Sequence, residues 1–332
     1  YLAGLSRADD NSPSHSAALT NSLAKVIERQ RQSEDAFVNL CLATTPQAWS
    51  IELHKNNEPL HLVYLPAQPG QESNNSTLDQ LYLHLNVTAQ EKCSVIEHYL
   101  HDSQGLSNYC THIELSEGAQ LSHGRRVLNS DRSAQISRTE LDVAANARYE
   151  LAEAIHHGML VRHEARVYFN GVNGHASVSS AARLTGKARL DQDWLMIHEA
   201  NHCKTEQNFR AAVDDHSSAS FTGRAKITER IAGSVVHQSS KGLMLSPDAA
   251  VNARPVLEIH ADEVQASHGA TVGCLDEAAW HYLRARGVPA DQARNMLIDS
   301  FVLGAFENFT DTELKEVLTV GLSDYQAEET LA

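Results

Sequence analysis

The sequence has few basic residues. Its 332 residues include 27 lysines and arginines against 42 aspartates and glutamates, which gives a formal net charge of −15. A negatively charged surface repels the phosphates of nucleic acids and of anionic lipid headgroups, and no run of basic residues offsets this repulsion. The charge balance therefore argues against nucleic acids and membrane surfaces as partners.

Long apolar runs are also missing. No stretch reaches the roughly 20 apolar residues that a membrane-spanning helix needs. Residues 1–12 lack the charged segment and the apolar core of a secretory signal. Because the sequence begins with Tyr1 rather than methionine, we interpret its first helical segment as truncated. We predict a cytoplasmic location.

Cysteine is scarce and widely spaced. The five cysteines are odd in number and form no CxxC pair: Cys41, Cys93, Cys110, Cys203 and Cys274. This usage is typical of a reducing compartment rather than of a disulfide framework. The phosphate-binding pattern GxxxxGK[ST] and the dinucleotide fingerprint GxGxxG are absent too, which argues against nucleotide hydrolysis by this chain.

The sequence is rich in short segments in which apolar and polar residues alternate. Examples are Ile51–His54, Leu81–Val87, Ala176–Ser179 and Val256–His260. Period-two alternation bounded by Gly, Asn and Asp predicts β-strands. The spaces between the segments leave little room for crossover helices, which disfavours a βαβ fold.

A repeat of 28 residues connects these strands. Turn-like positions recur at Gln90, Gly118, Asn146, Gly174 and His202, and strand-like residues follow each of them. A period of this size predicts a solenoid, in which each coil buries its apolar side against its neighbours. The many strands favour a β-solenoid over a helical one, and a large β-sandwich is the alternative on this pattern alone.

Helical patterns flank the strands. Leu19, Leu23, Val26 and Ile27 recur at helical spacing near the start. We therefore divide the chain into a helical segment (1–46), a β-solenoid (47–273) and a C-terminal helical domain (274–332). We expect the helices to cap the ends of the solenoid, or one end to stay open for a partner subunit.

Capping signals outline three helices in the C-terminal domain. Asp276 is a predicted N-cap, and Gly287 is predicted to end the first helix. A second helix is expected to begin after Pro289. A third is expected behind the capping box formed by Thr310 and Glu313. We expect the three to form a compact bundle.

One literal enzyme motif is present. His198-Glu199-Ala200-Asn201-His202 matches HExxH, which on a helix binds zinc through its histidines and activates water through its glutamate. The apolar alternation before it favours a strand, and no third ligand follows at the usual spacing. A zinc-dependent hydrolase is therefore kept as an alternative function, behind a non-enzymatic one.

A second group of candidate ligands lies near the end of the strand region. Glu258, His260 and Asp262 share one face of a predicted strand, and His268 follows. Imidazoles and carboxylates bind iron or zinc, but the same spacing is typical of a solvated strand face. Cys274 is interpreted as a small buried residue, with iron ligation as the alternative.

The segment Glu258–Gly273 resembles the most characteristic stretch of the SufB and SufD family. The flanking segments Leu243–Glu258, Tyr282–Gly287 and Asp291–Ile298 agree with it. The resemblance is strongest from Gly242 to Phe301, extends loosely back to Leu81, and is weak in the first 45 residues.

This resemblance implies a fold and a role. The fold is a right-handed parallel β-helix with a helical C-terminal domain. The role is that of a non-catalytic scaffold subunit of the SUF iron–sulfur cluster assembly machinery. Such subunits pair through their β-helices, and each helical tail docks one SufC-type ATPase. The partners implied are a SufB-like scaffold and a SufC-like ATPase, while the isolated chain forms either a monomer or a homodimer.

The resemblance also implies site residues. The helical tail carries more apolar residues than three short helices can bury among themselves, and these are the candidates for ATPase docking: Trp280, Tyr282, Leu283, Met296 and Phe301. His268 matches a histidine proposed as a cluster ligand at the subunit interface, with His260 and Glu258 beside it in sequence.

One departure from the SufB pattern favours the SufD branch. SufB-like chains are longer and carry cysteine in the signature segment, where this chain has Ala266. Any sulfur ligand at that place must then come from the partner. We therefore expect no cofactor in the isolated chain. The nascent iron–sulfur cluster, and a reduced flavin linked to SufB-containing assemblies, are expected only in the complex.

A polysaccharide-cleaving β-helix is a further alternative, but the region holds only one adjacent acidic pair, Asp214-Asp215.

Overall fold

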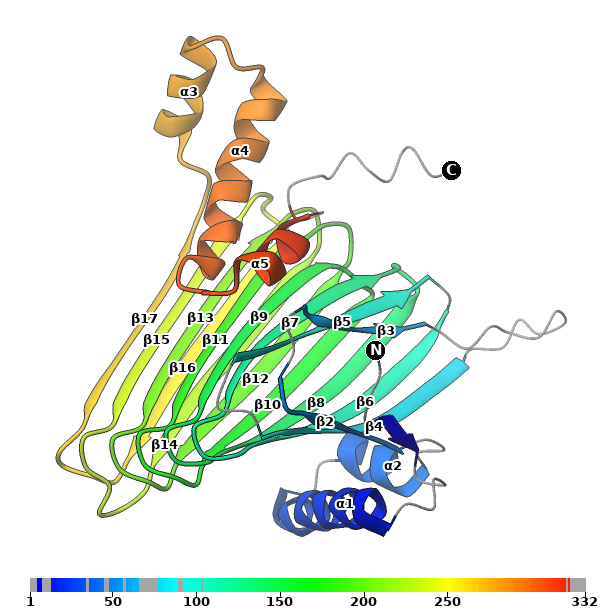
Figure 1. The fold of residues 1–332 in the computed structure, drawn as a ribbon. Helices are drawn as coiled ribbons and strands as arrows, with labels where there is room; N and C mark the ends of the chain where they lie inside the picture. The colour runs from blue at the N-terminus through cyan, green and yellow to red at the C-terminus, as the bar shows by residue number, and fades with distance from the viewer. Residues whose placement is uncertain are drawn as a thin grey trace, which may run out of the picture.

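The protein is described by a computed structural model that covers residues 5–7, 13–33, 36–44, 48–55, 58–65, 77–88, 92–102, 104–320 and 322. Figure 1 shows that its strands stack into a long, two-sided solenoid with helices along its sides. The predicted fold class, a parallel β-helix with short helical segments near both ends, is confirmed. The division into three domains at residues 46 and 273 stays a prediction.

Successive strands alternate between two sheets. Sheet A contains β1 (Leu5–Arg7), β2 (Ala48–Leu53), β4 (Thr77–Val87), β6 (Gly105–Leu115), β8 (Ser133–Val143), β10 (Leu160–Phe169), β12 (Arg189–His198), β14 (Ser218–Ile227) and β16 (Ala250–Ile259). Sheet B contains β3 (Leu60–Tyr64), β5 (Lys92–His101), β7 (Gln120–Asn129), β9 (Arg148–His157), β11 (His175–Leu184), β13 (Lys204–Val213), β15 (Val235–Met244) and β17 (Gln265–Gly273). Neighbouring strands run parallel, except that β1 pairs antiparallel with β2.

The predicted repeat is visible in the strand register. Gly105 of β6 pairs with Ser133 of β8, which lies 28 positions further along, and Gln120 pairs with Arg148 at the same spacing. Later coils are longer, so that Ser218 pairs with Ala250. The repeat therefore drifts toward the C-terminal end of the solenoid.

A column of left-handed turn residues explains the repeat. Gly118, Asn146, Asn173, His202 and Gly233 all have φ between 58° and 70°. The backbone N–H of each donates to a carbonyl oxygen of the next coil, for example from Gly118 to Ala145 at 2.9 Å. Glycine and asparagine adopt this conformation at low cost, which is why they occupy four of these five positions. The left-handed residue is Asn173 rather than the predicted Gly174, and the predicted Gln90 lies outside the described residues.

The core lies between the two sheets. Alternate residues of each strand point inward, and the largest of them stack from coil to coil. The rings of Phe209 and Phe221 stack with centroids 4.8 Å apart, and Trp194 meets Phe221 edge-on at 5.2 Å. The rings of Tyr64 and Tyr99 are also stacked, with centroids 4.5 Å apart. Period two alone thus places a continuous apolar column inside the solenoid.

The N-terminal helices cover the outer face of sheet A. α1 (Pro13–Ser33) and α2 (Ala36–Thr44) pack beside β2, β4 and β6 (Figure 1). Leu19 and Val26 are buried there, whereas Ile27 is exposed. The expectation that these helices cap an end of the solenoid is wrong, because they lie along its side.

The C-terminal helices do not form one compact bundle. α3 (Glu277–Ala285) packs on the first half of α4 (Ala290–Leu303), and this hairpin projects from the solenoid (Figure 1). The short 3₁₀ turn η1 (Gly304–Phe306) and α5 (Thr312–Thr319) lie on the outer face of sheet B. Small residues on that face leave room for apolar helix residues, in a shared cluster that includes Ala152, Ala154, Ala181, Ile298, Phe306 and Leu314.

The helix caps lie where they are predicted from the sequence, with one exception. The Asp276 side chain caps α3 by accepting from the N–H groups of Ala278 and Ala279, and Gly287 follows with φ 90°. The N-cap of α5 is Asp311, which accepts from the Leu314 N–H, and not Thr310 as expected. The Thr310 hydroxyl instead donates to Glu150 at 2.6 Å. Among the described residues, no helix is long and apolar enough to cross a membrane.

Candidate functional site at the open end of the solenoid

The two last strands leave one end of the solenoid open. β16 pairs only with β14 and β17 only with β15 among the described strands, so each presents an outer edge of backbone donors and acceptors. Apolar side chains are exposed along both strands, with 39% of Val256 and 45% of Val272 accessible. Unpaired edges of this kind recruit further strands.

The predicted ligand residues lie at this open end. Glu258 on β16 accepts from His260 at 3.1 Å and pairs with Lys226 at 3.2 Å. The hydrogen bond from His260 and the ammonium of Lys226 lower the pKa of Glu258. His268 is exposed on β17, where its register partner is Gln238. Within the described part of the chain, no hydrogen bond or ion pair joins His268 to Glu258 or His260.

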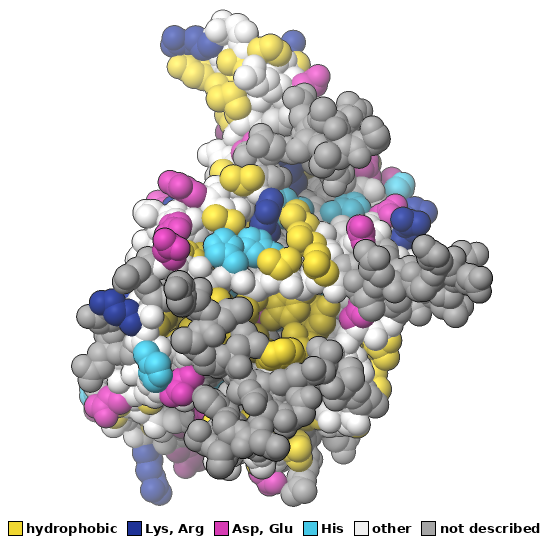
Figure 2. Space-filling view, turned by 45° about the vertical axis from the view of Figure 1, so that its right-hand side comes forward, with side chains coloured by type: hydrophobic (Ala, Val, Ile, Leu, Met, Phe, Trp, Pro, Cys, Tyr) yellow, Lys and Arg dark blue, Asp and Glu magenta, His cyan; other side chains and the backbone are white. Residues whose placement is uncertain are grey.

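The candidate docking residues lie on the projecting hairpin. Tyr282 and Met296 are exposed, and Figure 2 shows hydrophobic and basic side chains together at its far end. The Trp280 ring donates to the Ala290 carbonyl at 3.1 Å, which ties α3 to the start of α4. Leu283 is half-buried. Phe301 is half-buried against the solenoid, where the guanidinium of Arg210 lies 5.9 Å from its ring centroid.

A sequence model described as "SUF system FeS cluster assembly, SufBD core domain" matches residues 71–301. The chain belongs to the SufBD family. It is 27% identical over 235 residues to the iron–sulfur cluster assembly protein SufD of Escherichia coli, an alignment that covers 70% of this chain and 56% of the relative. This similarity, together with that to SufD of Bacillus subtilis, makes it a SufD-like member.

Two further relatives come from Synechocystis and Arabidopsis thaliana. A SufBD family protein of Synechocystis is 25% identical over 295 residues, which is 84% of this chain and 64% of the relative. Protein ABCI7, chloroplastic, of Arabidopsis thaliana is 28% identical over 268 residues, which is 79% of this chain and 56% of the relative. These alignments span a little over half of each relative.

The HExxH motif of this SufBD-family chain does not form a zinc site of the helical type. His198 ends β12, and His202 lies in the following turn with φ 59°. His198 is fully buried, and its Nε2 lies 2.7 Å from the Thr205 hydroxyl. Its burial lowers its pKa to about 4. The two histidines do not lie on a helix that would align them. The motif instead forms the end of β12 and the turn that follows it.

Cys274 differs from its interpretation as a buried residue. It is exposed, whereas the other four cysteines are buried. It lines a surface pocket of about 530 Å³ at the base of the hairpin, together with Trp280, Arg294 and residues 244–247. Its thiol is therefore open to solvent.

A ladder of buried charges, which we did not predict, lies inside the solenoid. Glu97, Arg125 and Glu153 are register partners on β5, β7 and β9, and all three are buried. Arg125 lies 3.3 Å from each carboxylate and 5.0 Å from the Tyr99 ring centroid. A 28-residue periodicity among these charges is the one signal that could have revealed the ladder.

Hydrogen bonds complete the ladder. Glu97 accepts from Tyr64 at 2.7 Å and lies 3.0 Å from His123, while Glu153 lies 3.0 Å from His163. Burial alone would raise the pKa of Glu97, but the hydrogen bond and charge of His123, with Arg125 nearby, lower it to about 2. Both carboxylates thus stay ionised around a single guanidinium, an arrangement that holds three coils in register.

Proposed function

We propose that this chain is a non-catalytic scaffold subunit of a SUF-type complex. It pairs with a SufB-like subunit through the open end of its solenoid and docks a SufC-like ATPase through the α3–α4 hairpin. The observation that carries the proposal is that the outer edges of β16 and β17 pair with no other strand in the described part of the chain, and that apolar side chains are exposed there. Strand addition to such edges provides backbone hydrogen bonds and apolar contacts together.

Several features support the non-catalytic role. The SufBD match covers most of the solenoid, and the one enzyme motif lies in a strand end and a turn. The nascent cluster, and any flavin, belong to the assembled complex, where a partner supplies the thiolate that Ala266 cannot. The cytoplasm and its reduced thiols are the setting proposed for this chemistry.

The proposed interface at the edge of β17 can be tested by introducing one charged side chain. Val272→Asp places a carboxylate on β17 at a position that is 45% exposed, so the isolated chain should fold normally. Co-purification with a SufB-like partner should fall by at least about tenfold, because the charge would be desolvated in the interface. Val172→Asp, at a turn position 44% exposed, is the matched control and should leave pairing unchanged. Equal loss in both variants, or in neither, would contradict the proposed interface.

His268 gives a second test. His268→Ala should abolish cluster formation in the assembled complex while thermal unfolding of the isolated chain is unchanged, because the side chain is exposed. His216→Ala removes another exposed histidine, which pairs with Asp248, and serves as the control. Cluster yield is measured by absorption after reconstitution with iron and sulfide. An undiminished yield from His268→Ala would remove this residue from the cluster site.

A further inference from the structure

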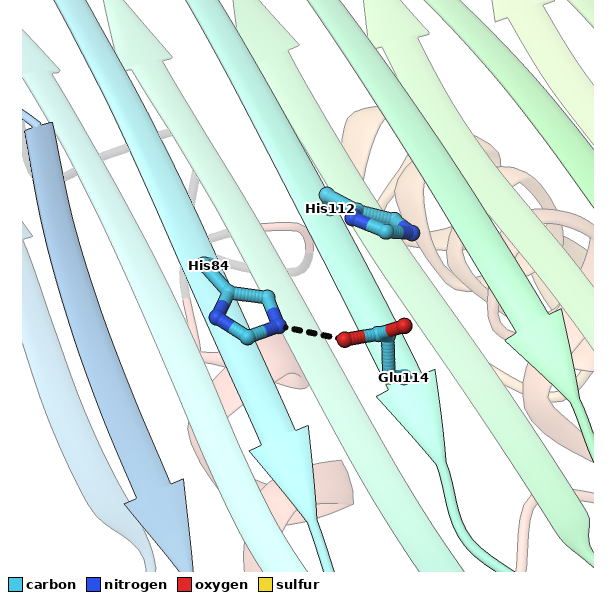
Figure 3. Close-up of side chains that lie close together, drawn as sticks. All are labelled: His84, His112 and Glu114. Carbon is cyan, nitrogen blue, oxygen red and sulfur yellow. Dashed lines mark hydrogen bonds and ion pairs between the residues drawn. The ribbon is translucent and has the colours of Figure 1, made fainter. Parts of the chain in front are cut away.

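A cluster of two histidines and a glutamate lies on the outer face of sheet A. His84 is on β4, and His112 and Glu114 are on β6. Each offers a ligand atom, and these atoms all lie within 4.8 Å of one another. Figure 3 shows the His84 ring directed at Glu114, with Nε2 and Oε2 2.9 Å apart, and the His112 ring close by. His84 and His112 are register partners, so the stacking of coils brings them together.

Serine hydroxyls hold the far side of both rings. Ser50 lies 3.0 Å from Nδ1 of His84, and Ser22 of α1 lies 2.7 Å from Nδ1 of His112. Ser22 also contacts the Tyr82 hydroxyl at 2.7 Å. With each Nδ1 held in this way, each Nε2 faces a carboxylate. A hydrogen bond at the distal ring nitrogen is the usual support of a metal-binding histidine.

The same contacts resemble a serine–histidine–acid triad, but the burial opposes that chemistry. Ser22, Ser50, His84 and His112 are all buried. A nucleophilic serine has to reach a substrate carbonyl, and these hydroxyls are covered by α1 and the sheet. A metal ion is much smaller than a substrate, and Lys25, which pairs with Glu114, is half-exposed.

The charges around the cluster suit a cation. Glu114 forms an ion pair with Lys25, whose side chain is 51% exposed. Asp142 lies 2.8 Å from Nε2 of His112 and 2.6 Å from Arg29. Glu114 thus accepts from both the Lys25 ammonium and the His84 ring. Two carboxylates and two imidazoles thus converge under one helix, where the Lys25 ammonium and the Arg29 guanidinium are the cations already paired with the carboxylates.

We infer that His84, His112 and Glu114 form a binding site for a divalent transition-metal ion such as Zn²⁺ or Fe²⁺, with Asp142 as a further oxygen ligand. Imidazole and carboxylate are the donors that these ions accept. Ligands about 2.1 Å from an ion lie about 3.0 Å apart at octahedral angles and about 3.4 Å apart at tetrahedral angles. The nitrogen–oxygen distances of 2.9 Å (His84 to Glu114) and 2.8 Å (His112 to Asp142) therefore have to widen only slightly around an ion. On binding, each Nε2 offers its lone pair, each Nδ1–H donates to its serine, and the Lys25 ammonium moves into solvent.

Zinc titration of the full chain, after treatment with EDTA, tests the site. Cys274→Ser is the background for every protein, because the exposed thiol is a competing zinc ligand. Calorimetry should show one zinc per chain. His84→Gln should weaken binding by more than about 100-fold, since loss of an outer-shell partner alone costs 10–100-fold. His216→Gln, at an exposed histidine, should leave the affinity unchanged.

The variant Lys25→Gln tests the site without replacing a buried side chain. It removes the competing ammonium from a half-exposed position, so zinc should bind about tenfold more tightly. Co²⁺ in place of zinc should give a visible absorption spectrum that is lost in His112→Gln. Equal zinc affinity in the background protein and His84→Gln would overturn the inference. If His84→Gln does not fold, an unchanged affinity in Lys25→Gln overturns it instead.

Discussion

Replacing Arg125 by methionine is expected to lower the free energy of unfolding by about 3 to 5 kcal/mol, the usual cost of leaving a buried charge without its partner. The variant would leave two ionised carboxylates, Glu97 and Glu153, inside the solenoid without the guanidinium between them. Burial lowers the pKa of Arg125, but the neighbouring Tyr99 and the two carboxylates outweigh burial and raise it well above its usual range, so the guanidinium stays charged at every accessible pH. Urea unfolding followed by circular dichroism measures the loss.

A compensated variant separates the charge from the packing. Glu97→Gln and Glu153→Gln, combined with Arg125→Met, remove all three charges and should recover most of the lost stability. Arg224→Met is the matched surface control, since Arg224 pairs with Asp193 where both are partly exposed. Its expected cost is below about 1 kcal/mol. A similar cost for Arg125→Met and Arg224→Met would show that the interior ladder does not stabilise the fold.

Replacing Trp194 by alanine is expected to cost about 3 to 5 kcal/mol, because it leaves a large cavity in the apolar column. Trp194 is fully buried, packs edge-on against Phe221, and lies 6.3 Å from the His163 ring. The loss should appear as a lower urea midpoint. It should be larger than that of any single aliphatic truncation in the same coil.

Trp280→Ala is the comparison for this effect. Trp280 lies on the projecting hairpin, where its ring packs under Arg284 and bonds the Ala290 carbonyl. Its removal should loosen the hairpin and leave the main unfolding transition of the solenoid in place, because no coil is disturbed. If the two tryptophan variants shift the main transition equally, the solenoid and the hairpin unfold as one unit.

The turn positions show how much of the fold could be predicted from sequence. Gly118 and Asn146 were recognisable because a left-handed backbone restricts the choice of residue, and a fixed spacing repeats that restriction. Asp276 was recognisable as an N-cap for a similar local reason. Thr310 was misassigned because two neighbouring residues could cap α5, and the choice fell to Asp311 once Thr310 had bonded Glu150.

The candidate sites were harder to predict from the sequence than the turns. Glu258 and His260 could be placed together because they are two residues apart on one strand. His84 and His112 could not, because their contact depends on which coils stack and in what register. The helices could be predicted, but not their positions along the sides of the solenoid, since an apolar helix face does not specify which surface it covers.

Local sequence patterns suffice to predict the repeating strands, the turns between them and the helices that follow, because each depends on the conformational preferences of a few neighbouring residues. Which charges are buried and which strand edges stay open depends instead on how the coils stack in three dimensions. Strands carry outward and inward polar residues alike, and stacking alone decides whether a glutamate such as Glu97 faces an arginine or water.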